Sequence, residues 1–378
     1  MKVLFVACQD NPFDHNAGSG KDYELYHGLK QNGADVVLAG PFPFSQTLIE
    51  RVFRKFHSKL FKRRPLKYPE SFLKIAARIV TEMIKTHNPD VIFSKYLPIL
   101  AKVKTDVPIV VLSDTTLAGS HREWPIFSQL AYQIQLNAEK KAYSMASRII
   151  VHSQWSVNDL LKVYKQPGEK VFMTPCPASI PDNIIPSSIH PKDLVPLKLL
   201  LVGREYQRKG IDIAIEVTNQ LNQLGHKTLL RIVGMNGESS DTIQFRGLYN
   251  KTIPEQLQEY VSNYEWANFL IHPARFEAAG IVPSEAAGFG VPTITNNVGG
   301  LGTTVSDGIS GIVLPKLSPP EEYIKSLIQY IEHPEEYNNL CKTTRERYEQ
   351  ELNWGVVSKK VYDLCLEAAS EKKTQKTN

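Results

Sequence analysis

Short apolar runs alternate with helical stretches along nearly the whole chain, and this alternation limits the fold more than any other feature of the sequence. Residues 3–7 (VLFVA), 107–112 (VPIVVL) and 199–202 (LLLV) are examples of the apolar runs. Continuous runs of this kind are typical of strands in a parallel sheet, because helices cover both of its faces. The alternation therefore predicts an α/β protein with doubly wound parallel sheets.

The length of the chain favours two domains. A single core rarely serves 378 residues. The alternation restarts after residues 181–196, which contain four prolines and no periodicity. We therefore predict a first domain over residues 1–180, a linker over 181–196 and a second domain over 197–355. A last helix is expected over 356–371, and the polar tail 372–378 is expected to be disordered.

Residues 268–300 carry the most informative local pattern. The apolar run at 269–271 predicts a strand. Pro283 suits the start of a helix, because its fixed φ angle fits that position and its missing N–H has no partner there. The predicted unit is a strand, a loop and a helix. The free N–H groups at the start of such a helix favour an anionic ligand such as a phosphate.

Two carboxylates flank the predicted helix start, Glu277 in the loop and Glu285 in the first turn. Carboxylates only accept hydrogen bonds, so a pair of them beside an anion site suits a ligand that carries many hydroxyls and also a phosphate. A nucleotide sugar fits that description. The alternative is that Glu285 merely favours the helix N-terminus electrostatically and that Glu277 is a solvated loop residue.

With Gly280, Ile281 and Val282 between them, Glu277 and Glu285 resemble the paired-glutamate motif of the retaining glycosyltransferases of the GT-B fold, family 4 in particular. The resemblance implies two Rossmann-like domains that face a cleft, with the last helix crossing back to the first domain. It implies transfer of a sugar from a UDP- or GDP-sugar to an acceptor hydroxyl, with no cofactor. Glu277 would then hold sugar hydroxyls and Glu285 the ribose.

Arg204 and Lys209 follow the strand predicted at 199–202, at the edge of the sheet where ligands collect in open α/β folds. A diphosphate beside two carboxylates would be repelled unless cations intervened, since helix dipoles contribute only about 0.3–1 kcal/mol each. The two residues also resemble the Arg and Lys with which the family holds the donor diphosphate, together with backbone N–H groups at 280–282. The alternative is a pair of ordinary surface cations.

A glycine-rich loop with Gly18 and Gly20 separates the first predicted strand from a helix predicted at about residues 22–32. This arrangement offers another place for a phosphate. The loop is not a Walker P-loop, because His15 stands where the first glycine is needed and Asp22 replaces the Ser or Thr. By resemblance, the loop lies near the donor diphosphate and the acceptor. A flexible turn without a ligand is the alternative.

Asp114 follows the strand predicted at 107–112 and is a candidate residue on the acceptor side. Family members often have a histidine followed by Asp here, whereas this chain has Ser113 at the histidine position and keeps Asp114. His121 is a substitute candidate. Asp114 as a simple helix cap is one alternative. The altered Ser113 also leaves open a catalytically silent nucleotide-sugar-binding subunit that supports a partner enzyme, and a phosphorylase or epimerase of the same fold is a further rival.

Residues 49–67 have the composition of a helix that lies on an anionic membrane surface. From residue 51 on, this segment holds eight Lys or Arg and no acidic residue, and Phe53 and Phe56 fall on one helical face with other apolar residues. A lipid-linked acceptor would suit such a surface, beside carbohydrate and small-molecule acceptors. The alternative is that the helix packs Phe53 and Phe56 into its own domain and leaves a solvated cationic face.

The distribution of charge supports an anionic partner for the first half. Residues 1–180 hold 24 Lys and Arg against 15 Asp and Glu, which gives +9, and the remainder hold 20 against 24, which gives −4. The four cysteines show no metal-ligand or redox spacing, so we expect reduced thiols in a cytoplasmic protein, at the inner membrane face if the basic helix binds there. No apolar run has the length of a signal peptide or a membrane span.

Two further classes of ligand are not expected. No Asp-x-Asp occurs in the chain, so the usual way of presenting a divalent metal to a diphosphate is missing, and we predict activity without a metal. The basic segment lacks base-stacking aromatic residues on strands, and we therefore predict no nucleic-acid partner.

Overall fold

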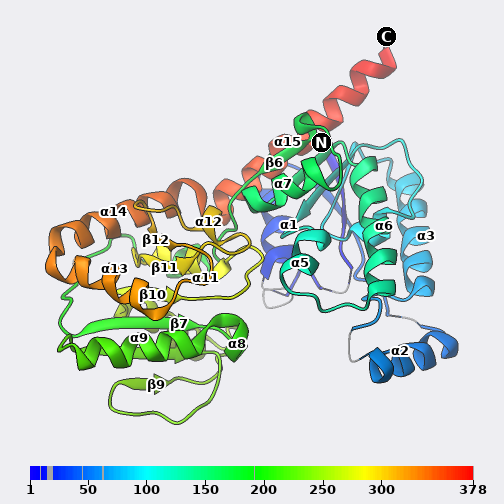
Figure 1. Cartoon of the computed structure of the whole chain (residues 1–378). Coiled ribbons are helices and arrows are strands. Elements are labelled where there is room, and N and C mark those ends of the chain that lie inside the picture. Colours follow the sequence, from blue (N-terminus) through cyan, green and yellow to red (C-terminus); the bar gives the residue numbers. More distant parts are fainter. Residues whose placement is uncertain (9, 15–19, 45, 62–63, 191, 378) are drawn as a thin grey trace. The chain divides into compact units, whose positions relative to one another are not determined.

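The computed structural model describes residues 1–378 except 9, 15–19, 45, 62–63, 191 and 378. The chain forms two compact units (Figure 1). The first comprises Met1–Thr174 and Trp354–Asn378, and the second comprises Pro175–Asn353. The first boundary therefore lies between Thr174 and Pro175, earlier than the residue 180 that we expected.

The first unit is built around a parallel sheet. Its strands are β1 (Lys2–Val6), β2 (Asp35–Ala39), β3 (Val91–Ser94), β4 (Ile109–Ser113), β5 (Arg148–Val151) and β6 (Val171–Met173). Its helices are α1 (Lys21–Gln31), α2 (Leu48–Phe61), α3 (Glu70–His87), α4 (Leu97–Leu100), α5 (Leu117–Glu123), α6 (Gln129–Met145), α7 (Gln154–Lys162) and α15 (Trp354–Thr377). A 3₁₀ turn at Gly168–Lys170 precedes β6. Within the described residues, the strands pair in parallel in the order β2-β1-β3-β4-β5-β6.

Alternate side chains of β1 enter two cores, one on each face of the first sheet. Leu4 and Val6 belong to the core that also contains Phe72 of α3. Val3 and Phe5 belong to the other core, together with apolar residues of α1 and α15. This two-sided burial explains why the strand is an uninterrupted apolar run in the sequence.

Helix α15 packs on the first unit, as predicted. It lies beside α1 (Figure 1), and its residues Val357 and Val361 are buried in the core that contains Val3. A Cβ at Gly28 would overlap the side chain of Ser358, so the glycine lets α1 and α15 approach closely. The helix runs from Trp354 to Thr377 and thus includes tail residues that we expected to be disordered.

The second unit contains a second parallel sheet. Its strands are β7 (Leu197–Val202), β8 (Thr228–Val233), β9 (Ile243–Phe245), β10 (Phe269–His272), β11 (Thr293–Asn296) and β12 (Gly311–Leu314). Its helices are α8 (Tyr206–Lys209), α9 (Ile211–Gln223), α10 (Pro254–Trp266), α11 (Ile281–Gly288), α12 (Leu301–Thr304), α13 (Pro320–Glu332) and α14 (Pro334–Glu351), with a 3₁₀ turn at Asp182–Ile184. In the described part of this unit, the strand order is β12-β11-β10-β7-β8-β9, again all parallel. Two doubly wound parallel sheets were predicted, and the fold class is confirmed.

The segment 181–196, which we expected to be a linker between the domains, packs on the second unit. Leu194 is buried in the core of the second unit with Leu197. The ammonium group of Lys192 donates hydrogen bonds to the carbonyls of Tyr264 and Ala267, at 3.2 and 2.8 Å. These contacts attach the segment to the second unit, and its prolines do not reveal them because they break periodicity without preventing packing.

Candidate active site

The second sheet reverses its strand order between β7 and β10. The chain runs outward from β7 through β8 to β9, and then returns to place β10 on the other side of β7. In open α/β sheets, ligands bind at the carboxyl ends of the strands where the order reverses. We call this position the switch point of the second sheet. The loop after β7 carries Arg204, and the loop after β10 carries Glu277.

Close contacts hold these two loops together. Gly210, at the start of α9, has a φ of 69°, and a Cβ there would overlap the carbonyl oxygen of Pro273. The N–H of Arg275 donates to the carbonyl of Arg208 at 2.8 Å. The guanidinium of Arg275 donates two hydrogen bonds to Asp212, at 2.8 and 2.6 Å. The loop after β7 is therefore fixed against the loop after β10.

Glu277 lies in a charged cluster that these loops form at the switch point. Its Oε2 pairs with Nζ of Lys209, and Nη1 of Arg208 lies 3.4 Å from the same oxygen. Nε2 of His272, the last residue of β10, lies 3.6 Å from it. The side chains of Glu277 and Lys209 are only 15% and 10% exposed. The structure thus brings Glu277 and Lys209 together from loops that are far apart in the sequence.

The cluster fixes the charge of its members. Burial on its own would raise the pKa of the Glu277 carboxyl, but Lys209 and His272 together outweigh burial and hold that pKa well below its usual range. Burial, aided by the charge of Lys209, lowers the pKa of His272 to about 4. At neutral pH the cluster therefore contains an ionised Glu277 and an uncharged imidazole beside it.

Arg204 adds a further cation to this region. It follows β7 directly after Gly203, and its side chain is exposed. Burial raises the pKa of Tyr260 on α10 well above its usual range, and the charge of Arg204 acts against that rise. The guanidinium therefore lies within electrostatic reach of Tyr260. Together with Arg208 and Lys209, it makes the switch point attractive to an anion.

Glu285 is enclosed in a separate hydrogen-bonded cluster, with its side chain only 1% exposed. The donors to its carboxylate are Ser179 (2.6 Å) and Lys251 (2.7 Å) at Oε1, and Tyr260 (2.5 Å) and Tyr264 (2.7 Å) at Oε2. Burial would raise the pKa of Glu285, but the Lys251 ammonium and these hydrogen bonds lower it. A ribose hydroxyl can reach this carboxylate only by replacing one of the present donors or sharing an oxygen with it.

Helix α11 begins earlier than the sequence pattern predicted. Its N-cap is Gly280, with a φ of 87°, and its helical residues start at Ile281 rather than at Pro283. Pro283 still lies in the first turn, where its missing N–H costs no hydrogen bond. Glu285 consequently lies beyond the first turn, so its predicted place in that turn was wrong. The first backbone N–H groups of the helix, which have no intrahelical partner, include those of Ile281 and Val282.

In the first unit, Asp114 belongs to a charged cluster at the carboxyl ends of β4 and β5. Its carboxylate pairs with Lys21 at the start of α1, and Nε2 of His152 lies 3.7 Å from it. The side chain of Asp114 is 48% exposed, and although desolvation opposes its ionisation, Lys21 and its other charged neighbours hold the pKa of the carboxyl well below the usual range. Nδ1 of His152 hydrogen-bonds to the carbonyl of Thr174 at 2.9 Å and so carries the proton. Asp114 is not the cap of α5, because the side chain of Thr116 caps that helix.

Buried polar groups also lie where the first sheet reverses its strand order, between β1 and β3. Asp22 of α1 is buried, and its carboxylate accepts a hydrogen bond from Tyr96 at 2.6 Å and lies 3.1 Å from the ammonium of Lys95. Gly20 is the N-cap of α1, with a φ of 75°. Gly18 lies outside the described residues.

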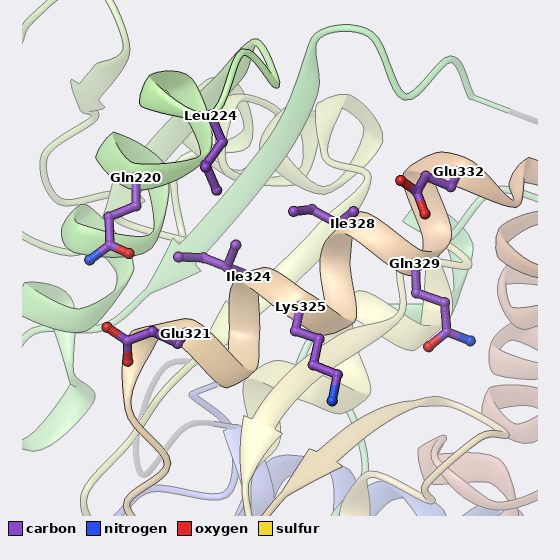
Figure 2. Close-up of a pocket in the computed structure, with 8 residues that line it drawn as sticks. All are labelled: Gln220, Leu224, Glu321, Ile324, Lys325, Ile328, Gln329 and Glu332. Atoms are coloured by element: carbon purple, nitrogen blue, oxygen red, sulfur yellow. The ribbon is translucent and has the colours of Figure 1, made fainter.

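A groove between α9 and α13 has a different character (Figure 2). Leu224 faces Ile324 and Ile328 across it, while Lys325 and Gln329 point away. Its floor is apolar, and it lacks the converging charged groups of the switch point. Its exposed residues are therefore suitable positions for control variants. Among the described residues, no group of three or more His, Cys, Asp or Glu is placed to hold a metal ion.

Sequence reasoning missed several members of these clusters. Arg208 and His272 had a detectable signal, since both lie at or just after the carboxyl end of a strand that borders the switch point. No such signal marked the donors to Glu285. Lys251 precedes α10, and Tyr260 and Tyr264 lie on it, so only the packing of that helix brings them to Glu285.

Both halves of the chain match models of known families. Residues 23–179 match Glycosyltransferase Family 4, and residues 187–347 match Glycosyl transferases group 1. The chain belongs to the group 1 glycosyltransferases. This glycosyltransferase is 24% identical over 274 residues to glycogen synthase of Mycobacterium tuberculosis, and the match covers 70% of this chain and 64% of that protein.

Solved structures agree with the GT-B fold of this glycosyltransferase. Sucrose-phosphate synthase from Thermosynechococcus elongatus aligns over 98% of this chain and 99% of its own, with 18% identity and a TM-score of 0.68. Anabaena Alr3699/HepE, solved in complex with UDP-glucose, aligns over 96% of this chain and 98% of its own, with 18% identity and a TM-score of 0.61.

Proposed function

We propose that this glycosyltransferase moves a sugar from a nucleotide diphosphate sugar, with UDP or GDP as the nucleotide, to a hydroxyl of an acceptor. The observation that carries the proposal is the cluster of Glu277, Lys209 and Arg208 at the switch point of the second sheet. The departing diphosphate gains negative charge in the transition state, and cations already fixed there stabilise that charge. The UDP-glucose complex of HepE supports this class of donor.

Each residue of the cluster has a role in the proposal. Arg204 and Lys209 hold the diphosphate, together with the free N–H groups of Ile281 and Val282 at the start of α11. Glu277 is ionised and accepts hydrogen bonds from sugar hydroxyls. Because Lys209 is already paired with that carboxylate, the binding of a diphosphate requires its ammonium to be shared between the two anions.

Glu285 holds the ribose only after its own cluster rearranges. Its four present donors already satisfy both carboxylate oxygens. Lys251 is the donor that leaves most readily, because its side chain is 27% exposed and can be solvated outside the cluster. Ribose hydroxyls then take its place on Oε1.

The reaction retains the configuration of the sugar. The bond between the anomeric carbon and the phosphate oxygen breaks, and the bond to the acceptor oxygen forms on the same face. The acceptor proton passes to the departing phosphate oxygen. This route suits a site whose carboxylate, Glu277, is paired with two cations, since such pairing weakens a carboxylate as a nucleophile.

Activity does not require a divalent metal in this proposal. Arg204, Arg208 and Lys209 supply the positive charge that a metal would otherwise bring to a diphosphate. The absence of any Asp-x-Asp from the sequence is consistent with this assignment.

The acceptor binds to the first unit, where Asp114, Lys21 and His152 meet. The acceptor class is a carbohydrate, a lipid-linked molecule or a small molecule with a free hydroxyl. We assign the chain to the cytoplasm, because its four cysteines are free thiols. No helix in the described part of the chain combines the length and apolar composition needed to cross a bilayer.

A catalytically silent nucleotide-sugar-binding subunit is the second candidate. The observation that favours it is Ser113, whose hydroxyl donates to the carbonyl of Thr115 at 2.7 Å and is thus engaged within its own loop. Such a subunit would bind a nucleotide sugar without consuming it.

Release of nucleoside diphosphate from a panel of UDP- and GDP-sugars separates the two candidates. The proposed enzyme hydrolyses one donor slowly without acceptor, and faster when the right acceptor is added. Glu277→Ala abolishes both rates, whereas Glu321→Ala, an exposed glutamate on α13, leaves them unchanged. Donor binding without any turnover in the wild type would favour the silent subunit, and sugar-phosphate turnover without a nucleotide would favour a phosphorylase.

A further inference from the structure

Helix α2 exposes an apolar face. The large apolar side chains on this face are 49–82% exposed: Leu48 (74%), Ile49 (82%), Val52 (65%), Phe53 (49%) and Phe56 (64%). They recur at spacings of three and four residues, which places them on one side of the helix. The alternative that Phe53 and Phe56 pack into their own domain is therefore wrong.

The helix is attached to the first unit through polar residues. The carboxylate of Glu50 accepts hydrogen bonds from the N–H and hydroxyl of Ser71, at 3.0 and 2.6 Å. His57 is buried, and its Nε2 lies 2.7 Å from the hydroxyl of Ser128. Surface helices ordinarily turn their apolar side to the core and their polar side to water. Here the apolar side is exposed to water as well as the cations Arg51 and Lys55, so the apolar face needs a partner other than its own unit.

The charges around this face select the partner. Eight Lys or Arg and no acidic residue lie at positions 51–67, and Arg51 and Lys55 are exposed on the helix itself. A second copy of the chain would bring the same positive charge to the contact and would be repelled. Anionic lipid headgroups are attracted by these cations, while the acyl boundary accepts the apolar side chains.

We propose that α2 lies in the interface of an anionic membrane, with Ile49, Val52 and Phe56 inserted among the lipids and Arg51 and Lys55 at the phosphates. Figure 1 shows α2 at one end of the first unit, beyond the ends of α3 and α6. The inference goes beyond the reaction proposed above. It concerns where the protein works, and its test measures no catalysis, so either proposal can fail without the other.

Vesicle flotation tests the inference. The full chain is mixed with vesicles of phosphatidylcholine that contain phosphatidylglycerol, and separately with vesicles of phosphatidylcholine alone. We expect the wild type to float with the anionic vesicles at least 10-fold more than with the neutral ones. We expect added salt to weaken this binding, because it screens the cations.

Matched variants separate the face from general surface effects. Phe53→Asp with Phe56→Asp is expected to lower flotation at least 10-fold without changing the thermal midpoint, because both side chains are exposed. The control is Leu161→Asp with Val163→Asp, which adds the same charge at exposed apolar residues at the C-terminal end of α7, at the other end of the unit (Figure 1). This control is expected to float as the wild type does. Arg51→Gln with Lys55→Gln is expected to lose part of the preference for anionic vesicles.

Three results would overturn the inference. One is equal flotation of the wild type and the Phe53→Asp, Phe56→Asp variant. Another is failure of the wild type to float with either kind of vesicle. The third is a wild type that is dimeric in light scattering and does not bind vesicles, with a Phe53→Asp, Phe56→Asp variant that is monomeric. That result would assign the face to self-association.

Discussion

The ammonium of Lys209 pairs with the carboxylate of Glu277, a residue 68 positions away in the sequence, at the switch point of the second sheet. The pair depends on two loops that touch through Gly210 and Pro273. It places a cation suited to a diphosphate next to an anion suited to sugar hydroxyls. A nucleotide sugar has both groups, and this correspondence is the basis of the function proposed here.

Gly210→Ala is expected to abolish activity and to destabilise the second unit. A Cβ at this position would overlap the carbonyl oxygen of Pro273, and the φ of 69° is unfavourable for any residue with a side chain. The strained backbone conformation alone costs about 1–2 kcal/mol. The backbone must also shift to relieve the overlap, and this shift displaces the neighbouring Lys209. Urea unfolding and donor turnover measure the two effects. Gly225→Ala is the control, because its φ is also positive, at 89°, while nothing lies near its Cβ position. Equal behaviour of the two variants would contradict the role of the loop contact.

Glu285→Ala is expected to lower the free energy of unfolding by about 3 kcal/mol or more, because it leaves buried hydroxyls and the partly buried Lys251 ammonium without their acceptor. Lys251→Met should cost less, since Ser179, Tyr260 and Tyr264 still satisfy the carboxylate. Chemical denaturation of both variants measures the difference. If Glu285→Ala destabilised the chain no more than Glu321→Ala does, the cluster would not contribute as described.

The two buried histidines are expected to destabilise the chain as the pH falls from about 6.5 to about 4, against an opposite contribution from Glu139, whose pKa burial raises from 4.5 to about 7. His272 and His152 are buried and uncharged in the folded chain, with pKa values lowered from 6.5 to about 4. Between these values the two rings bind more protons in the unfolded chain than in the folded chain, so their protonation favours unfolding. Each shift corresponds to roughly 3 kcal/mol at most.

Urea unfolding between pH 7 and pH 4 measures this dependence. On acidification His272→Asn should lose less stability than the wild type, because the variant lacks one of the two titrating rings. A further loss of stability is expected below pH 4.5, the ordinary pKa of a glutamate. The pKa values of Glu277 and Glu285 are lowered in the folded chain, so their charges stabilise the fold until the pH falls to those lowered values. The same loss of stability between pH 7 and pH 4 in the wild type and in His272→Asn would contradict the assignment of a neutral buried His272.

Asp114→Asn is expected to lower kcat/KM for the acceptor by roughly 10- to 100-fold while donor binding is unchanged. The substitution removes the charge that Lys21 neutralises, but it leaves the cations of the second unit untouched. Steady-state kinetics with varied acceptor, together with donor titration, measures both quantities. Asp106→Asn, an exposed position in the same unit, is the control. A loss of donor affinity in Asp114→Asn would assign the residue to the donor side instead.

Much of the fold and part of the site could be predicted from the sequence. Buried parallel strands appear as apolar runs, so the runs at 3–7 and 199–202 located two strands. Ligands collect at strand ends in such sheets, which led to Arg204 and Lys209 as candidates, whereas Glu277 was a candidate through its pairing with Glu285 around a predicted helix start. The donors around Glu285 could not be predicted, because no local pattern ties Lys251 or α10 to that carboxylate.

Neither the attachment of residues 181–196 nor the exposure of the apolar face of α2 could be predicted from the sequence, and the reason is the same. Periodicity shows which side chains of a helix share a face, but only tertiary contacts decide which face is covered. Polar anchors such as Glu50 with Ser71 are not visible in the sequence.

Thermal stability in the presence of nucleotide sugars tests the central assignment most directly. At 100 times its Kd, the correct UDP- or GDP-sugar should add about 2.7 kcal/mol to the stability of the wild type. This gain should vanish in Lys209→Ala and persist in Lys325→Ala, an exposed lysine on α13. Equal stabilisation of the wild type and of Lys209→Ala, or no stabilisation by any nucleotide sugar, would contradict a donor site at the Lys209 and Glu277 pair.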